Sequence, residues 1–122
     1  VNLELRLGPI VEDRDVARWL FFRDDDDRPE VDGWLDRLGD ESYLAFAGML
    51  ADLPRPGRVD VPLLVVAAEA DRVFSLAEQA ATAAAHRAEF VVVPGAAHDV
   101  MLDPGWEVAA EAIAEFVDRR VA

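Results

Sequence analysis

The sequence contains no cysteine and carries little positive charge. The absence of cysteine excludes disulfide bonds, thiolate zinc sites and cysteine nucleophiles. Twelve basic residues, all of them arginine, stand against 25 acidic residues, which gives a net charge of −13. A chain this acidic does not attract phosphate backbones or anionic lipid, so nucleic acid and membrane surfaces are not expected as partners.

Long apolar runs are also lacking. The longest, residues 61–68, is interrupted by Pro62 and is far shorter than the roughly 20 residues that a membrane-spanning helix needs. The first residues, VNLELRLGP, show no basic region followed by an apolar stretch, so they do not look like a secretory signal. We therefore expect no membrane span and a cytoplasmic location.

Sites for nucleotides, metals and other cofactors are not predicted. The sequence has no lysine, no glycine-rich phosphate loop and no dinucleotide fingerprint, which argues against kinases and dehydrogenases. The acidic run Asp24–Asp27 fails the calcium-loop pattern, because Pro29 stands where a glycine must turn the chain. We interpret this run as a solvated loop. His86 and His98 match no zinc-binding spacing, and His86 is interpreted as a cation at a helix end.

The apolar content is sufficient for one folded domain. The 122 residues are 52% hydrophobic, with a mean hydropathy of +0.07, which is typical of a chain with a single core. Two prolines and a glycine between Leu53 and Gly57 divide the chain. Residues 1–57 are predicted to be mostly helical, and residues 58–122 to form a regular α/β part.

The first part is predicted to hold a short strand and three helices. Alternating apolar residues predict a half-buried strand over residues 1–7. Asp13 is predicted to cap a helix that runs to Leu20. A second helix opens at Pro29 and ends at Gly39 in a left-handed cap, and a third begins at the next residue. The third helix has apolar residues at spacings of three and four: Tyr43, Leu44, Ala47, Leu50 and possibly Leu53.

The second part alternates strands with helices. Apolar, β-branched runs over residues 61–67 and 90–93 predict two strands, the first of them covered on both faces of a parallel sheet. Ser75 and Glu78 form a capping box that starts an alanine-rich helix between the strands. The order strand, helix, strand, helix predicts an α/β fold with two parallel strands and a crossover helix.

A last helix is predicted after the second strand. Its start is marked by Asp103-Pro104, a capping residue followed by proline. One face of this helix is apolar: Val108, Ala112, Ile113, Phe116 and Val117.

Two residues with catalytic chemistry follow the two strands. Asp71 lies in the turn after the first strand and His98 in the loop after the second. Functional residues of parallel α/β sheets gather at the carboxyl ends of the strands. There a histidine can move a proton while a carboxylate fixes its tautomer. The alternative is that Asp71 only caps a turn and that His98 is an incidental loop residue.

The segments VPLLVVAAEADRVFSLAEQ and EFVVVPGAAHDVMLDPGWEVAAEAIAEFVDRR resemble the carboxyl-terminal part of an α/β-hydrolase, close to the esterase, lipase and lysophospholipase-like branch. The resemblance implies that Asp71 is the catalytic acid, with Glu69 as a less suited substitute, and that His98 is the catalytic base. It implies that residues 11–53 form a helical cap over the active site. It also implies a partial α/β-hydrolase fold, less than half of such an enzyme.

No nucleophile is predicted in these residues. The Gly-x-Ser-x-Gly elbow, which precedes acid and histidine in this family, has no match, and the oxyanion hole that depends on it is missing too. Ser42 lacks flanking glycines, the capping box uses Ser75, and Thr82 lies inside a helix. If the substrate is a small-molecule ester, the serine is expected from the amino-terminal half of the hydrolase, on another chain or in a segment that these residues do not include. A second chain with that half, a homo-oligomer, or the strand of residues 1–7 folded back beside residues 61–67 would each cover the open edge of the sheet, and the sequence does not choose among them.

Two alternatives to a serine hydrolase stay open. One is a non-catalytic, truncated hydrolase-like module that uses its sheet edge for oligomerisation or binding. The other keeps the fold but uses an aspartate nucleophile, as haloalkane dehalogenases and epoxide hydrolases do. Only the missing half of the enzyme separates the second alternative from the first hypothesis.

Large apolar side chains are expected to lie in the core more often than to contact a substrate. Met101 and Trp106, beside the histidine loop, are expected to pack that loop in place. Five aromatic residues of the first part are interpreted as core, or as the lining of an acyl pocket under a cap: Trp19, Phe21, Phe22, Trp34 and Tyr43.

Overall fold

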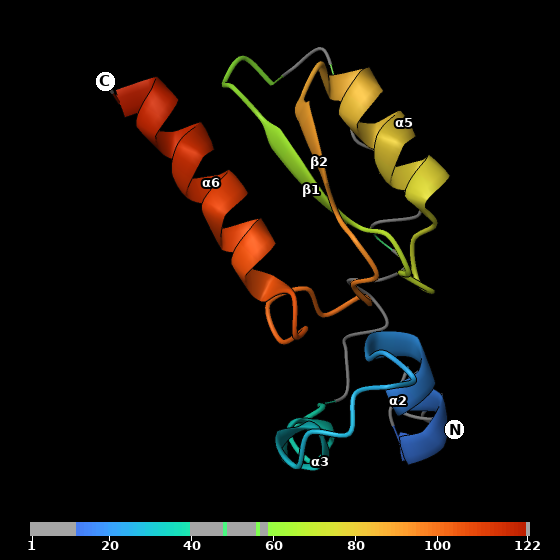
Figure 1. Ribbon diagram of the computed structural model, residues 1–122. Coiled ribbons are helices and arrows are strands. Elements are labelled where there is room, and N and C mark those ends of the chain that lie inside the picture. Colours follow the sequence, from blue (N-terminus) through green and yellow to red (C-terminus); the bar gives the residue numbers. More distant parts are fainter. Residues whose placement is uncertain (1–11, 40–47, 49–55, 57–58, 122) are drawn as a thin grey trace.

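The computed structural model describes residues 12–39, 48, 56 and 59–121, which form a mixed α/β fold (Figure 1). The strand predicted over residues 1–7 and the helix predicted from Asp40, with Ser42 and Tyr43, lie outside these residues. So does most of the predicted boundary between residues 53 and 57. The elements of the described part are α2 (Arg14–Phe21), α3 (Glu30–Leu35), β1 (Leu64–Ala68), α5 (Leu76–His86), β2 (Glu89–Val93) and α6 (Trp106–Val121).

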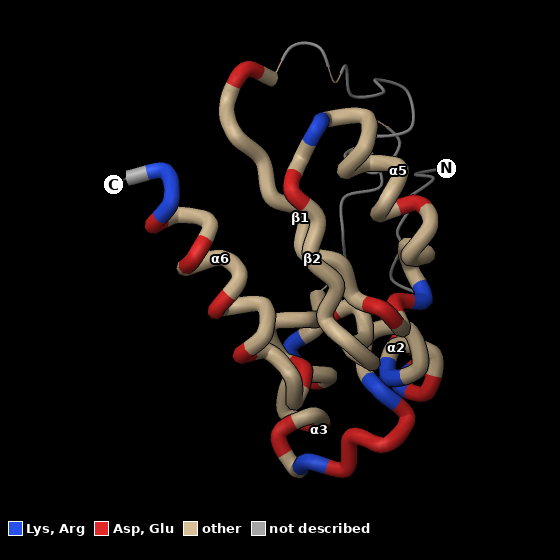
Figure 2. The backbone as a smooth tube through the Cα atoms, turned by 45° about the horizontal axis from the view of Figure 1, so that its top comes forward, with Lys and Arg blue, Asp and Glu red and all other residues tan. Residues whose placement is uncertain are grey.

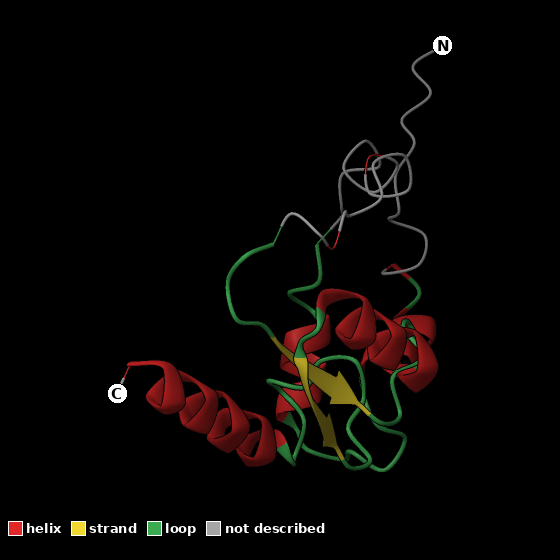
Figure 3. Ribbon diagram, turned by 90° about the horizontal axis from the view of Figure 1, so that it is seen from above, coloured by secondary structure: helices red, strands yellow, loops and turns green. Residues whose placement is uncertain are grey.

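The sheet consists of β1 and β2, which pair in parallel from Leu64 opposite Glu89 to Ala68 opposite Val93. α5 connects the two strands and lies on one side of the sheet, and α6 lies on the other (Figures 1 and 3). The predicted α/β class with two parallel strands is confirmed. None of the helices in the described part has the length and apolar composition of a membrane span.

β1 starts later and is less buried than the sequence predicts. In this register the residue opposite Val61 would be His86, which still belongs to α5, so the ladder begins at Leu64. Only Ala67 and Ala68 of β1 are buried, and its first three residues are half-buried. Coverage on both faces is therefore limited to the carboxyl end of the strand.

α5 begins and ends where its side chains and backbone predict. The Ser75 hydroxyl accepts from the Glu78 N–H at 3.3 Å, and the Glu78 carboxylate accepts from the Ser75 N–H at 2.8 Å. Arg87 closes the helix in the left-handed conformation, with φ of 53°. The predicted capping box is confirmed, and Ser75 is occupied by it.

α6 covers the sheet with a smaller surface than its sequence predicts. The helix begins at Trp106, because Asp103 first closes a turn in which its carboxylate accepts from the Gly105 N–H at 2.9 Å. Ala109 is buried in a cluster with residues of both strand ends. Three members of the predicted apolar face are 42 to 49% exposed: Val108, Ile113 and Val117.

α2 and α3 pack against each other around a second core. Asp13 caps α2 as predicted, since its carboxylate accepts from the N–H groups of Asp15 and Val16 at 3.1 and 3.2 Å. The prediction for the second helix is wrong at its end: α3 stops at Leu35, where the chain tightens into 3₁₀-type turns, and Gly39 has no positive φ. The buried residues of this core are Ala17, Phe22, Val31 and Leu35.

Figure 2 shows the acidic run between α2 and α3 in red, and its ion pairs and burial mean that it is not simply solvated. Asp24 pairs with Arg72 at 2.6 Å, and Asp26 pairs with Arg28 at 2.6 Å. Asp26 is buried, with only 3% of its surface exposed. The guanidinium groups compensate the repulsion between neighbouring carboxylates, which the sequence alone did not indicate. In the described part of the chain no cluster of acidic or histidine side chains could hold a metal ion.

Candidate functional site

The site lies on two adjacent loops at the carboxyl ends of β1 and β2. Backbone hydrogen bonds hold the loops together: the Ala70 N–H donates to the Ala96 carbonyl at 2.8 Å. Gly95 turns the second loop with φ of +66°, a conformation that favours glycine. The Gly95 N–H donates to the Glu69 carboxylate at 2.8 Å. The two loops therefore form one connected surface beyond the sheet.

Asp71 and His98 meet on this surface. His98 Nδ1 lies 3.0 Å from Asp71 Oδ2 and 3.2 Å from Oδ1. The Asp71 side chain is only 6% exposed, whereas His98 is 27% exposed. A carboxylate only accepts hydrogen bonds, so Nδ1 is the donor and the Nε2 lone pair is left as the acceptor. Nε2 makes no hydrogen bond with the described residues, and it is the atom available to a reacting group.

The Asp71 carboxylate is held by its own loop. Its Oδ1 accepts from the N–H groups of Val73 at 2.7 Å and Phe74 at 3.0 Å. Asp71 therefore caps a turn, as the alternative interpretation expected, but it does not only do so, because the same carboxylate also contacts His98. Glu69 contacts Gly95, so Asp71 is the carboxylate that pairs with His98.

Two phenylalanine rings flank the imidazole of His98. The Phe21 ring centre lies 5.6 Å from it and the Phe74 ring centre 5.8 Å, both tilted. Phe21 is the last residue of α2, and its carbonyl accepts from the Asp99 N–H at 3.2 Å. Of the aromatic residues considered from sequence, Phe21 therefore reaches the site. Phe22 and Trp34 instead stack on each other in the core of the α2–α3 unit.

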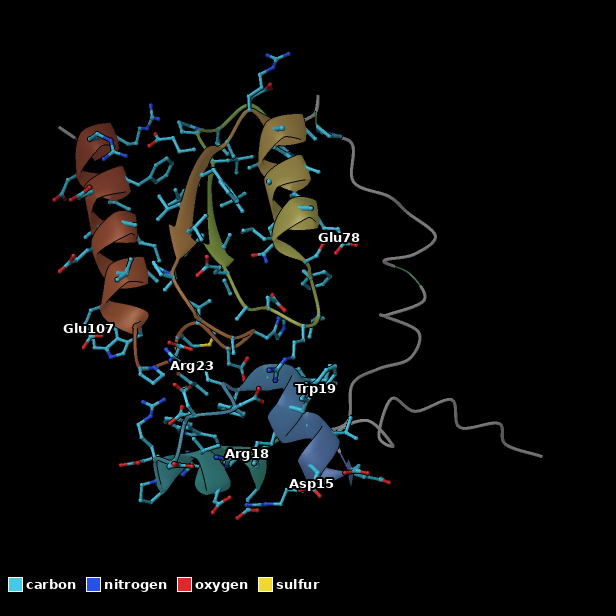
Figure 4. All side chains as sticks on the ribbon, turned by 45° about the vertical axis from the view of Figure 1, so that its right-hand side comes forward. Asp15, Arg18, Trp19, Arg23, Glu78 and Glu107 are labelled. Carbon is cyan, nitrogen blue, oxygen red and sulfur yellow. The ribbon has the colours of Figure 1, made fainter. Side chains whose placement is uncertain are left out.

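Arg72 joins α2 to the loop that carries Asp71, residues 69–74, which we call the acid loop. Its guanidinium donates to the Trp19 carbonyl at 2.5 Å, to both carboxylate oxygens of Asp24, and lies 5.0 Å above the Trp19 ring. Hydrogen bonds from Arg72 lower the pKa of Asp24. Figure 4 shows Trp19 and Arg23 on the side of α2 and its following loop that faces the strand ends. No pattern in the sequence indicates this contact, because Arg72 and Asp24 are 48 residues apart.

Asp99 is a second carboxyl group beside the pair. Burial raises the pKa of Asp99, the positive charge of His98 opposes that rise, and the negative charge of Asp71 adds to it. The effect of desolvation is the largest of the three. Asp99 was not predicted as a site residue from the sequence, although it directly follows His98.

Side chains expected near the site do not all lie there. Met101 is 70% exposed, so the prediction that it packs the histidine loop is wrong, whereas Trp106 is 47% exposed and lines a groove together with Val100 of that loop. The packing comes instead from Leu102, which contacts the core of α2 and α3, and from Val100, which contacts the core at the strand ends. Met101 and Trp106 line an apolar groove of about 270 Å³ beside Val66 and α6.

The described part of the chain offers no hydroxyl nucleophile to His98. The Ser75 hydroxyl donates to the Glu78 carboxylate at 2.6 Å, and the Thr82 hydroxyl donates to the Glu78 carbonyl at 3.0 Å. Both side chains belong to α5 and its cap. His86 ends α5 as predicted, and its buried Nδ1 has no hydrogen-bond partner among the described residues.

A pocket of about 280 Å³ lies where the loop after α2 meets the two strand-end loops. Its wall includes Ala70 and Ala97, which adjoin Asp71 and His98 in sequence. No family model, curated protein or solved structure matches the chain.

Proposed function

We propose that Asp71 and His98 are the acid and base of a serine-type α/β-hydrolase that acts on carboxylic esters. The nucleophilic serine is supplied from outside the 122 residues. The observation that carries the proposal is the 3.0 Å contact between His98 Nδ1 and Asp71 Oδ2, at the carboxyl ends of two adjacent parallel strands. The other charged pairs among the described residues join carboxylates to arginine, which does not exchange protons near neutral pH.

The proposed reaction uses both nitrogens of His98. Asp71 accepts the Nδ1 proton and so fixes the tautomer that leaves Nε2 as a base. Nε2 takes the serine proton as the serine oxygen attacks the ester carbonyl, and returns it to the departing alcohol. Water then attacks the acyl-enzyme with Nε2 again as base, and the proton that Nε2 takes from the water returns to the serine oxygen. This step releases the carboxylic acid product and restores the serine.

The open edge of β1 supports a role as part of a larger sheet. Alternate residues of a parallel strand bond to the same neighbour, and the Glu69 N–H donates to Val93 on β2. Leu64 and Val66 therefore direct their N–H and C=O groups to the other edge, where no described residue pairs with them. A strand of the nucleophile-bearing chain fits there, because bare edge groups are a template for strand pairing.

The position of α2 supports a role as a cover over the reacting atoms. The Phe21 ring packs against His98, and Arg72 ties α2 to the acid loop. An apolar ring beside the base excludes water from one side of the imidazole and offers a surface to an acyl chain. We assign substrate selection to this region.

Covalent labelling tests the proposal. A fluorophosphonate forms an adduct only with an activated serine, and intact-mass spectrometry detects it. The 122-residue chain alone is expected to give no adduct, and its assembly with the nucleophile-bearing chain is expected to give one. His98→Ala should abolish labelling of the assembly, and Asp71→Asn should slow it by about 10³-fold or more.

His86→Ala serves as the matched control, because His86 lies at the far end of α5 and does not contact Asp71 or His98. It should leave labelling unchanged. Labelling of the His98→Ala assembly at the wild-type rate would overturn the proposal, as would an assembly in which no serine reacts.

A non-catalytic binding module is the second candidate. The observation that favours it is the exposed apolar groove beside β1 and α6, lined in part by Val66, Met101 and Trp106. In a binding module the same assembly would form, but no serine would react with the fluorophosphonate. The labelling experiment therefore separates the two candidates.

A further inference from the structure

Gln79, in the first turn of α5, makes three hydrogen bonds from its side chain to backbone atoms. Its Oε1 accepts from the Ala68 N–H at 3.1 Å. Its Nε2 donates to the carbonyl oxygens of Ala68 at 3.1 Å and Phe74 at 2.7 Å. Ala68 ends β1 and Phe74 lies just before α5, so a single side chain joins both ends of the loop that carries Asp71.

The Ala68 groups that Gln79 binds point away from β2. The next residue, Glu69, donates its N–H to Val93 on β2, and alternate residues of a parallel strand face opposite edges. Ala68 is 2% exposed. Without the amide of Gln79, its buried N–H would have no partner among the described residues, which is costly, and its C=O would keep only the long 3.5 Å hydrogen bond from the Asp71 N–H. Gln79 thus makes the hydrogen bonds to Ala68 that a neighbouring strand would otherwise make.

Phe74 links this contact to the proposed acid and base. Its carbonyl accepts from Gln79, its N–H donates to Asp71 Oδ1 at 3.0 Å, and its ring lies 5.8 Å from that of His98. A shift of the Phe74 backbone would therefore move both the N–H that donates to Asp71 and the ring that packs against His98.

We propose that Gln79 is a positioning residue that holds Asp71 within hydrogen-bonding distance of His98 Nδ1. Its importance for catalysis rests on the proposed function. Its effect on the geometry of the pair does not, because the contact between Asp71 and His98 is made within this chain.

The test is made on the chain itself with Gln79→Met, which keeps side-chain length and removes all three hydrogen bonds. ¹⁵N NMR of histidine-labelled protein, at about pH 8.5 where an ordinary imidazole is neutral, reports which ring nitrogen carries the proton. His86→Gln assigns the signals. We expect the proton of His98 on Nδ1 in the wild-type chain and loss of that form as the major species in Gln79→Met.

Amide hydrogen exchange gives a second measurement. The Ala68 N–H should exchange about tenfold faster in Gln79→Met, because its hydrogen bond to Oε1 is lost. Thr82→Ala is the matched control, since it removes a hydrogen bond from a side chain to the backbone within α5, away from the acid loop. Neither the tautomer nor the Ala68 exchange rate should change in the control.

A folded Gln79→Met chain that keeps the proton of His98 on Nδ1 would overturn the positioning role. If the variant does not fold, Gln79→Glu, which keeps the shape and one acceptor but removes both donors, is tested in the same way. A changed tautomer in a chain whose assembly never reacts with a fluorophosphonate would support the positioning role and refute the hydrolase function instead.

Discussion

His98 is contacted by three side chains from two separate parts of the chain. Asp71 binds its Nδ1, Phe74 from the acid loop packs on one side, and Phe21 from α2 packs on another. A solvent-exposed histidine keeps its rotamer freedom, whereas this one is oriented by a hydrogen bond and two rings. At the scale of single residues, the imidazole is thus held in one orientation, which is what the proposed function requires of Nε2.

Asp26 is the buried charge on which the α2–α3 loop depends. Its carboxylate accepts from the backbone N–H and the guanidinium of Arg28, and these hydrogen bonds lower the pKa of Asp26 while burial opposes the shift. Removing one partner of a buried ion pair leaves the other charge unpaired. We expect Asp26→Asn to reduce the free energy of unfolding by about 1–2 kcal/mol at pH 7, measured by urea denaturation.

The pH dependence of the stability lost in Asp26→Asn follows from the lowered pKa of Asp26. Since the pKa of Asp26 is lower in the folded than in the unfolded chain, its contribution is complete above the unfolded value of ~3.9 and is lost as pH falls through the folded value. The difference between wild type and Asp26→Asn should be constant from about pH 5 to 7 and shrink below about pH 4. Asp27→Asn, at the exposed neighbour, is the control; equal stability of both variants would contradict the prediction.

Among the elements, α5 shows how local side chains set a boundary on which the site depends. The capping box of Ser75 and Glu78 fixes its first residue, and Gln79 in the same turn binds the end of β1. The Asp71 loop is therefore closed at a defined length between a strand and a capped helix. A frayed first turn of α5 would release the loop as well.

Ser75→Ala tests the contribution of this cap. The substitution removes the acceptor for the Glu78 N–H, and loss of such a cap costs about 1 kcal/mol of unfolding free energy. Urea denaturation followed by circular dichroism measures it. Thr82→Ala, in the interior of the same helix, should be neutral or slightly stabilising because alanine is the better helix former. An unchanged midpoint for Ser75→Ala would show that tertiary packing alone fixes the start of α5.

At the scale of the whole molecule, a small number of polar contacts join the α2–α3 unit to the sheet. Arg72 binds the Trp19 carbonyl, Arg28 donates to the Leu102 carbonyl, and the Asp99 N–H donates to the Phe21 carbonyl. Leu102 adds an apolar contact to the core of α2 and α3. Because these contacts adjoin the loops of Asp71 and His98, the attachment of the unit and the shape of the site are coupled.

Arg72→Met tests that attachment. It removes the guanidinium from Trp19 and Asp24 but keeps an apolar side chain over the indole ring. We expect the amides of α2 to exchange with solvent about fivefold faster, as for the loss of about 1 kcal/mol, while those of β2 are unchanged. Arg37→Met, on an exposed side chain after α3, is the control. Equal exchange in α2 of both variants would show that apolar packing alone holds the unit.

Sequence reasoning succeeded where the deciding contacts lie within a few residues. The caps at Asp13 and Ser75 follow from neighbours two or three positions away, and the two strands follow from their own β-branched residues. The positions of Asp71 and His98 just after these strands followed from the same pattern. Parallel pairing then brings the two loops together, because it aligns the carboxyl ends of both strands.

The features that were predicted wrongly or not at all depend on contacts between residues that are far apart in the sequence. The burial of Asp26, the exposure of Met101 and the contact of Phe21 with His98 each depend on residues more than a turn away along the chain, or on how two units pack. The ladder of β1 begins at Leu64 because of where α5 ends, which its own apolar run does not show. No local pattern encodes such contacts, since they exist only after the chain has folded.

The sequence by itself therefore determined the α/β class, the caps and the order in which acid and histidine follow the strands, because these depend on local periodicity and hydrogen bonding. The tertiary structure alone decided that Asp71 Oδ2 lies 3.0 Å from His98 Nδ1, that Phe21 covers the imidazole and that Gln79 closes the acid loop. These contacts join residues from different elements, and their distances are fixed by how the strands, loops and helices pack.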